Sequence, residues 1–377
     1  MRKNFLGGLS NAEFLRRHWQ KKPLLAREAL RGSSDIVTRD DLVDLAQRDD
    51  VESRIVTSSG GRWHVRHGPF RRRDIARLPR EGWTLLVQGV DQVLWQAARL
   101  LREFAFIPYA RLDDIMVSYA APGGGVGPHF DSYDVFLLQG SGKRRWRVSR
   151  QRDLDLVPGA PLKILQRFRP EDEWLVEPGD LLYLPPRCAH EGVALGACIT
   201  YSIGFRAPSA QELGARFLEF LQDQLEIDGM YSDPDLQVAA RPARIPPEMV
   251  RRSAAMLDKL RWTKSDVVRF LGCYLTEPKA QVVFARPKRA ATPAEFERRA
   301  GADGIRLAPA TRMLFQGRRI FVNGESFEPA ETAARSCAKL ADARELRAPL
   351  DLDGEARALL YDWYRAGYIA LGADRQR

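Results

Sequence analysis

Two histidines and one aspartate, each beside a short strand-like segment, constrain this chain more than any other feature. His129 and Asp131 are one residue apart in GPHFDSYDVFLLQ, and His190 ends the later segment DLLYLPPRCAH. The chain contains only five histidines, so the placement of two of them beside strand-like sequence is informative. Imidazole and carboxylate groups are ligands in many transition-metal sites. The pattern predicts that His129, Asp131 and His190 bind one metal ion.

The sequence around the His-x-Asp triplet decides between this hypothesis and a surface histidine beside a solvated aspartate, which chance also produces. A glycine-rich run (123–127) and Pro128 indicate a loop that leads directly into a strand. Strand residues alternate between faces, so we expect His129, Asp131 and Tyr133 to project to the same side. Two imidazoles and one carboxylate on one side of an ion leave the other positions open. This is the facial triad of non-haem Fe(II) oxygenases, whose open positions admit a co-substrate and dioxygen.

The sequence before His190 predicts a second hairpin. Residues 174–176 are strand-like, residues 177–180 form a turn of the sequence EPGD, and residues 181–184 are an apolar strand that Pro185 ends. Short hairpins that bring ligands to one cavity are typical of a cupin, or double-stranded β-helix. We therefore predict an α+β chain whose centre is a cupin jelly roll.

These segments resemble those of a known family. The likeness is carried by FLRRHWQKKPLL (14–25), LDDIMVSYAAPGGGVGPHFDSYDVFLLQGSGKRRWRV (112–148) and EPGDLLYLPPRCAHEGVA (177–194). In these segments the chain resembles the JmjC-type 2-oxoglutarate oxygenases, and within them the bacterial ribosomal oxygenases. The resemblance implies an Fe(II)- and 2-oxoglutarate-dependent dioxygenase that hydroxylates a side chain of a ribosomal protein. In the bacterial branch that side chain is an arginine of protein L sixteen of the large subunit, and the co-products are succinate and carbon dioxide.

The residues themselves point to how 2-oxoglutarate would be held. The oxo-acid end can fill two open positions of the metal, and the far carboxylate then needs a fixed cation. Arg144 shares a strand face with Trp146 and Val148, whereas Arg145 and Arg147 share the opposite face. The arginine beside apolar neighbours is the inward one, and its fork matches a carboxylate, so we choose Arg144. The family also uses a basic residue here.

The strand predicted at 112–120 supplies a second inward row, made of Asp114, Met116 and Ser118. Ser118 resembles the hydroxyl with which family members hold 2-oxoglutarate. Asp114 would compensate the charge of a substrate guanidinium, which is costly to bury unpaired. Alternatively, Asp114 is a turn residue or the residue at which the strand begins. Tyr133 would stack on the guanidinium and its stem. The remaining substrate candidates are Met116 and, more weakly, Ser202.

Composition limits the setting and the partners. The apolar content of 45% suits a folded domain, and the apolar runs are far shorter than the roughly twenty residues of a membrane helix. Four cysteines without C-x-x-C spacing favour a reduced cytoplasmic setting. The net charge of +10 suggests an anionic partner such as ribosomal RNA. The sequence shows no RNA-recognition motif, so we do not expect direct nucleic-acid binding.

Changes of pattern predict three domains: an oxygenase domain at 1–207, with helices first and β-rich sequence from about 112, a helical domain at 208–264 and a winged-helix-like domain at 265–377. In the second, apolar residues recur every four positions from Leu213 to Leu225. Such a stripe either packs on its own oxygenase domain or pairs with a second copy. The family resemblance favours a homodimer.

The last domain combines helices with a hairpin around Gly317. We also expect a strand at 281–285, where the sequence is QVVFA. Helices with a small hairpin resemble a winged helix, which the bacterial family carries at this end. Two other functions stay open: a ribosomal histidyl hydroxylase of the same chemistry, and a transcription regulator that joins a cupin sensor to a winged helix.

Overall fold

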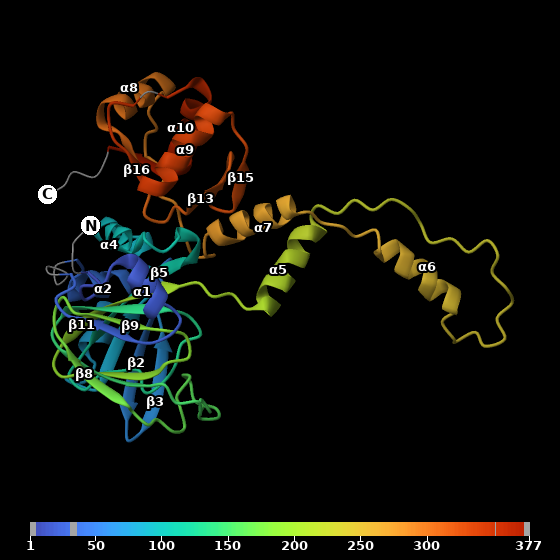
Figure 1. Ribbon diagram of the computed structural model, residues 1–377. Coiled ribbons are helices and arrows are strands. Elements are labelled where there is room, and N and C mark those ends of the chain that lie inside the picture. The colour runs from blue at the N-terminus through green and yellow to red at the C-terminus, as the bar shows by residue number, and fades with distance from the viewer. Residues whose placement is uncertain (1–4, 31–35, 351, 373–377) are drawn as a thin grey trace.

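The computed structural model describes residues 5–30, 36–350 and 352–372. Figure 1 shows a β-rich lower part, a C-terminal part above it and an arm that projects to one side. The predicted fold class is confirmed: a cupin jelly roll is followed by a helical segment and a C-terminal winged helix.

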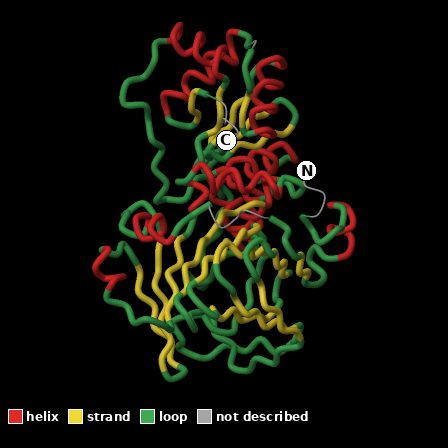
Figure 2. The backbone as a smooth tube through the Cα atoms, turned by 90° about the vertical axis from the view of Figure 1, so that its left-hand side faces the viewer, coloured by secondary structure: helices red, strands yellow, loops and turns green. Residues whose placement is uncertain are grey.

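Two antiparallel sheets form the jelly roll. The larger sheet has eight strands in the order β1-β9-β6-β11-β5-β4-β2-β3. In chain order these are β1 (Leu24–Ala26), β2 (Ser53–Ser59), β3 (Arg62–His67), β4 (Trp83–Val87), β5 (Leu112–Ala120), β6 (Val135–Ser141), β9 (Leu181–Leu184) and β11 (Cys198–Phe205). The smaller sheet has the order β10-β7-β8, with β7 (Arg144–Ser149), β8 (Asp172–Val176) and β10 (Ala189–Ala194). Figure 2 shows these strands in yellow in the lower part of the molecule.

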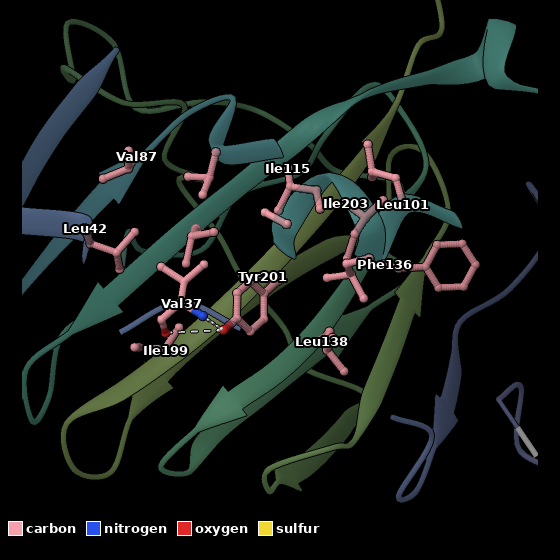
Figure 3. Packing of buried hydrophobic residues seen from close by; sticks show 14 of the residues in the cluster. Val37, Leu42, Val87, Leu101, Ile115, Phe136, Leu138, Ile199, Tyr201 and Ile203 are labelled. Atoms are coloured by element: carbon pink, nitrogen blue, oxygen red, sulfur yellow. Dashed lines mark hydrogen bonds between the residues drawn. The ribbon is translucent and has the colours of Figure 1, made fainter. Parts of the chain in front are cut away.

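Side-chain alternation divides the larger sheet into an outer and an inner face. On β5 and β11, Ile115, Val117, Tyr201 and Ile203 point outward into a fully buried apolar cluster, part of which Figure 3 shows. Phe136 lies among the rings of this cluster, and burying such a side chain contributes roughly 1.5–3 kcal/mol. The intervening residues of these strands must therefore face the space between the two sheets.

A smaller apolar cluster fills part of the space between the sheets. It joins Leu137 and Leu182 of the larger sheet to Trp146, Val148 and Val176 of the smaller one. Trp146 and Val148 thus point inward, which gives Arg144 the same direction because it is on the same face of β7. This part of the prediction for residues 144–148 is confirmed.

Helices precede and interrupt the strands of the first part. They are α1 (Asn11–Arg17), α2 (Arg39–Leu45), α3 (Arg72–Ala76), α4 (Trp95–Leu100) and the short 3-10 turns η2 (Val90–Gln92), η3 (Leu101–Phe104) and η4 (Tyr109–Arg111). Ser10 and Glu13 form the capping box that begins α1, so two amide groups at its first turn are satisfied. The helices α1, α2 and α4 lie at the end of the jelly roll that faces the C-terminal part (Figure 1).

Helices α5 (Ala210–Gln222) and α6 (Pro247–Leu257) belong to the arm, and α7 (Lys264–Thr276) returns the chain to the body of the protein (Figure 1). Phe217 and Phe220 of α5 pack on Phe270 of α7, with ring centroids 5.2 and 5.7 Å apart. Gly272 of α7 lies under Phe321, where a Cβ atom would be 2.3 Å from the ring. Glycine therefore sets how closely α7 packs against the C-terminal part.

The C-terminal part has its own buried core, which includes Phe296, Ile320, Leu340 and Trp363. Its elements are α8 (Pro293–Asp303), β12 (Ile305–Leu307), β13 (Met313–Gln316), β14 (Arg319–Val322), β15 (Glu325–Phe327), α9 (Glu331–Ala343), β16 (Glu345–Leu346), α10 (Gly354–Ala366) and β17 (Ile369–Leu371). The predicted hairpin around Gly317 is present as β13 and β14. The proposed domain boundaries at 207 and 264 stay predictions.

Three local predictions are wrong. Residues 129–133 form no regular strand: His129 makes an isolated bridge, residues 132 and 133 form a bend, and β6 begins only at Val135. Strands β2 to β4 lie before residue 112, although we placed the β-rich sequence after that point, and they extend the larger sheet. Residues 281–285 form a turn and loop, since no strand among the described residues pairs with them; Val283 is 71% exposed and Phe284 packs on Tyr368.

Among the described residues, no helix combines the length and the apolar character that are needed to span a bilayer.

Candidate metal centre and its surroundings

Backbone hydrogen bonds bring the two histidines together across the chain. The amide of His129 donates to the carbonyl of His190 at 2.9 Å, and the amide of His190 donates back at 2.8 Å. Residues that exchange both bonds in an antiparallel bridge lie directly opposite each other, and their side chains leave on the same side. The glycine-rich loop is thereby fixed to the start of β10, so two distant ligands meet without a continuous strand.

The turn between β9 and β10 positions the third ligand. Pro185 and Pro186 end β9, and Arg187 adopts a left-handed backbone with φ of +64°. In this conformation the amide of Arg187 donates to the carbonyl of Asp131 at 2.7 Å. The extended backbone from His129 to Asp131 is therefore held at both ends, and the Asp131 carboxylate is directed toward the histidines.

The three side chains converge as predicted. One ligand atom from each of His129, Asp131 and His190 can be chosen so that all lie within 4.8 Å of one another. Nε2 of His190 is 3.7 Å from Oδ2 of Asp131, and the two imidazole centroids are 4.2 Å apart. Such spacing suits one divalent ion bound between two nitrogens and one oxygen.

The backbone also fixes which ring nitrogen of each histidine is available. Nδ1 of His129 is 2.9 Å from the carbonyl of Gly127, and Nδ1 of His190 is 2.9 Å from the carbonyl of Cys188. A carbonyl only accepts, so each Nδ1 carries the proton and each Nε2 keeps its lone pair for a metal. Burial and the neighbouring His129 lower the pKa of His190 to about 4, so its imidazole is neutral at pH 7.

Arg144 is a buried cation at the far end of the same inner surface. It is 5% exposed, and no acceptor among the described residues binds its Nε or Nη2. Its guanidinium is 5.6 Å from the ring centroid of Trp146, which in turn is 5.8 Å from the ring of His190. A buried cation without an anion is costly, so this site fits an anionic ligand that reaches from the metal to Arg144.

Glycine allows the Trp146 ring to lie between these groups. Gly192 lies opposite Trp146 in the register of β10 and β7, between His190 and Ala194. A Cβ atom at Gly192 would be 2.7 Å from the indole ring, so any larger residue displaces Trp146. The residues present therefore fit both a divalent metal and a dicarboxylate co-substrate such as 2-oxoglutarate.

Ser118 lies on the inner face, as the strand alternation predicted. It is buried, it pairs with Thr200 in the register of β5 and β11, and its hydroxyl is 3.4 Å from the Thr200 carbonyl. That distance is long for a hydroxyl donor, so the group is available for a stronger acceptor. Its role toward 2-oxoglutarate stays a proposal.

The four substrate candidates lie on one side of the larger sheet. Met116 and Ser202 are opposite each other in the register of β5 and β11. Tyr133 is 41% exposed at the rim and lies near Gly204. The partial burial of its ring and the nearby carboxylate of Asp131 raise the pKa of Tyr133, so its phenol stays protonated. Their contacts with a substrate stay proposals.

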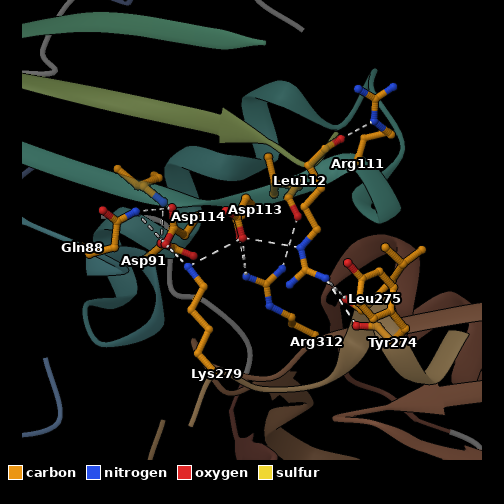
Figure 4. Close-up of polar contacts among 12 residues, drawn as sticks. Gln88, Asp91, Arg111, Leu112, Asp113, Asp114, Tyr274, Leu275, Lys279 and Arg312 are labelled. Carbon is orange, nitrogen blue, oxygen red and sulfur yellow. Dashed lines mark hydrogen bonds and ion pairs between the residues drawn. The ribbon is translucent and has the colours of Figure 1, made fainter. Parts of the chain in front are cut away.

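Asp114 is buried and already has partners, which the sequence did not indicate. Its carboxylate accepts two contacts from Nε2 of Gln88, at 2.8 and 3.0 Å, and lies 2.6 Å from Nζ of Lys279 (Figure 4). Gln88 follows the apolar strand β4, and Lys279 lies beyond α7. Neither has a local signal that would have linked it to Asp114.

Comparisons with known proteins agree with this geometry. Residues 99–213 match the JmjC domain family, and residues 259–370 match the ROXA-like winged helix. The Escherichia coli ribosomal protein uL16 3-hydroxylase is 37% identical over 320 residues, which cover 84% of this chain and 85% of the relative.

Solved structures show the same architecture. The X-ray structure of E. coli ycfD has a TM-score of 0.84 and 34% identity, and the match covers 96% of this chain and 98% of that one. A structure of the same protein with cobalt and 2-oxoglutarate has a TM-score of 0.80 and 32% identity over the same shares of the two chains. Fold and centre together define a JmjC-type 2-oxoglutarate oxygenase, as predicted. Within that class, this chain belongs to the ribosomal oxygenase family.

Replacing His190 with alanine tests the metal assignment. We expect the affinity for Co(II), measured by calorimetry without co-substrate, to fall by at least about tenfold, because even the loss of a group that only orients a ligand costs 10–100-fold. His64→Ala is the control, since His64 is an exposed residue of β3 outside the centre. Equal affinities in the two variants would contradict the assignment.

Replacing Arg144 with methionine tests the co-substrate site. Hydrogen bonds to charged groups are worth about 1.5–3 kcal/mol, so we expect the dissociation constant of 2-oxoglutarate for the Co(II)-loaded protein to rise about 10–100-fold. Arg147→Met is the matched control, because Arg147 is on the opposite face of β7 and pairs with Glu191. Unchanged 2-oxoglutarate affinity in the Arg144 variant would exclude the assignment.

Proposed function

We propose that this chain is a cytoplasmic, Fe(II)- and 2-oxoglutarate-dependent hydroxylase of an arginine side chain in ribosomal protein uL16, the protein L sixteen of the family resemblance. The observation that carries the proposal is the convergence of His129, Asp131 and His190 on the surface that also holds Arg144, whose Nε and Nη2 have no acceptor among the described residues. The relative named uL16 3-hydroxylase supports the choice of substrate protein.

In this proposal, His129, Asp131 and His190 hold the metal, and Arg144 and Ser118 bind the far carboxylate of 2-oxoglutarate. The bound iron, with 2-oxoglutarate and dioxygen, supplies the oxidising chemistry that adds one oxygen atom to the substrate and leaves succinate and carbon dioxide. The backbone carbonyls of Gly127 and Cys188 keep each imidazole in the tautomer that can bind. The apolar cluster around Trp146 keeps water away from the co-substrate.

The acidic inner row favours arginine over histidine as the substrate residue. Asp114 is a buried carboxylate, and a guanidinium offers it a forked pair of charged donors. A neutral imidazole has no charge for that carboxylate to compensate. In the proposal, Tyr133 stacks on the arginine stem, while Met116 and Ser202 line the remaining wall.

Incubation of the purified protein with Fe(II), 2-oxoglutarate and a uL16 fragment tests the function. We expect succinate to form in step with peptide that has gained the mass of one oxygen atom, located on an arginine by fragmentation. Asp131→Ala should abolish both products, because the metal loses its carboxylate ligand. Asp49→Ala, an exposed carboxylate far along the chain, is the control. Oxygen located on a histidine would favour the histidyl hydroxylase instead, and succinate without modified peptide would contradict the substrate.

We also propose that the arm forms a homodimer. Of residues 208–264, all of which the structure describes, Leu221 alone is buried. Large apolar side chains point outward along the arm: Leu218, Ile227, Met230, Leu236, Val238, Ile245, Val250, Leu257 and Trp262. A hollow of about 640 Å³ lies between α6 and the preceding loop, lined by Leu236 and Met249.

A monomer rarely exposes so large an apolar surface, and a second arm related by a twofold axis would bury the same face on both copies. Val250 and Leu257 lie seven residues apart on one face of α6. We expect Val250→Glu with Leu257→Glu to convert a dimer into a monomer in sedimentation equilibrium. Ala255→Glu, on the opposite face, should leave the dimer intact. A wild-type monomer at micromolar concentration would exclude the dimer.

A further inference from the structure

The carboxylate of Asp114 is saturated by groups of the protein itself. Gln88 contacts both of its oxygens, and the Lys279 ammonium lies 2.6 Å from Oδ2 (Figure 4). The Asp114 side chain is 4% exposed, so its negative charge needs a nearby cation in the free protein. Lys279 therefore supplies the positive charge that the proposed function assigns to the substrate.

Two further carboxylates lie at this end of β5, and one of them, Asp113, also has Arg206 and Arg312 beside it at 3.4 and 3.8 Å. Asp91 is 4% exposed, its Oδ1 accepts the amide of Ile115 at 2.7 Å, and burial together with the charge of Asp114 raises its pKa. Asp113 is the third carboxylate, 3.7 Å from the Lys279 ammonium. Burial lowers the pKa of Lys279, but Asp114 and Asp113 raise it more, so the ammonium stays charged.

Lys279 lies where it can move. It belongs to the loop between α7 and α8, not to a helix or strand, and its side chain is 29% exposed. It lines a hollow of about 520 Å³ together with Tyr133, Asp113 and Glu277, whereas Asp114 is not among the described residues that line it. On this side Lys279 covers Asp114, and Asp113 and Glu277 are acceptors to which a displaced ammonium can turn.

The charges determine what can displace Lys279. A guanidinium forms two parallel bonds with a carboxylate, but one of the two Asp114 oxygens is taken by the ammonium. An entering arginine must remove Lys279, and it gains a second charged hydrogen bond by doing so. An entering lysine exchanges one ammonium for another, and an entering neutral side chain offers Asp114 no charged hydrogen bond in return.

We propose that Lys279 is the resident cation of the substrate site in the proposed hydroxylation: an entering cationic side chain must displace it from Asp114, and a guanidinium gains a second charged hydrogen bond when it does so. The inference rests on the proposed function, which assigns the arginine to Asp114. Competition with Lys279 therefore sets how tightly the substrate binds, whereas the preference for arginine comes from its paired hydrogen bonds to Asp114.

Two substitutions at Lys279 test the proposal in opposite directions. Lys279→Met removes the competitor, so the dissociation constant of a fluorescent uL16 peptide, measured by anisotropy on Co(II)-loaded protein, should fall about threefold or more, since a fraction of the protein no longer has the site blocked. Lys279→Arg installs a forked competitor, so the same constant should rise by about threefold or more. The KM for the peptide should follow the same order, with kcat nearly constant.

A second readout separates competition from general damage. The free Lys279→Met protein should melt at a lower temperature, because Asp114 loses its charge partner, and it should nevertheless bind the peptide more tightly. The arginine peptide and its arginine-to-lysine twin should gain affinity by about the same factor in this variant, because both displace the same ammonium. Lys21→Met is the matched control, because the Lys21 ammonium contacts the Leu15 and Arg16 carbonyls, remote from Asp114.

The outcomes distinguish the inference from the function on which it rests. If peptide binding weakens or is unchanged in Lys279→Met, or does not weaken in Lys279→Arg, Lys279 positions Asp114 or has no role, and the proposal is wrong. If the predicted order of binding holds but no variant hydroxylates the peptide, the competition stands and the proposed function fails.

Discussion

The site depends on one pair of backbone hydrogen bonds, between His129 and His190. These bonds attach the loop after β5 to the first residues of β10. The strand pairing within either sheet would not bring these two elements together. Both imidazoles then leave the bridge on the same side. Asp131 reaches them because the left-handed Arg187 binds its carbonyl. The metal centre is thus assembled by main-chain contacts, and the side chains supply the ligand atoms.

Alternation along strands was the reliable part of the prediction. It placed Arg144 inward on β7, because Arg144 shares a face with the apolar Trp146 and Val148. It placed Asp114, Met116 and Ser118 inward on β5, because the apolar residues between them mark the opposite face. The same reasoning failed for residues 129–133, where a bend interrupts the backbone and no ladder forms, and for residues 281–285, which have no partner strand among the described residues. Strand β2 was not predicted, because several polar residues obscure its alternation. The partners of Asp114, Gln88 and Lys279, could not be predicted, since their proximity arises from tertiary packing alone.

The C-terminal part is attached to the sheet that lines the cavity. Arg312 donates to the backbone carbonyls of Leu112 and Asp113, and Lys279 binds Asp114 on the same strand. Arg206, which follows β11, donates to the carbonyl of Leu275 at 3.1 Å. These contacts place a winged helix directly beside the inner row of β5. Winged helices are often linked to DNA, but the contacts seen here are made with the protein's own oxygenase part.

The two histidines share one local geometry: each Nδ1 is bonded to the carbonyl of the residue two positions earlier. A main-chain oxygen is present whatever amino acid occupies that position. The thiol of Cys188 can therefore be exchanged during sequence drift without moving the proton on His190, provided that the turn keeps its shape. Position 127 has less freedom, because Gly127 has a φ of +78° and a Cβ atom there would be 2.7 Å from the ring of Trp63. Variation at position 127 should thus be limited to glycine by space, whereas position 188 should accept any small side chain that fits the buried apolar cluster.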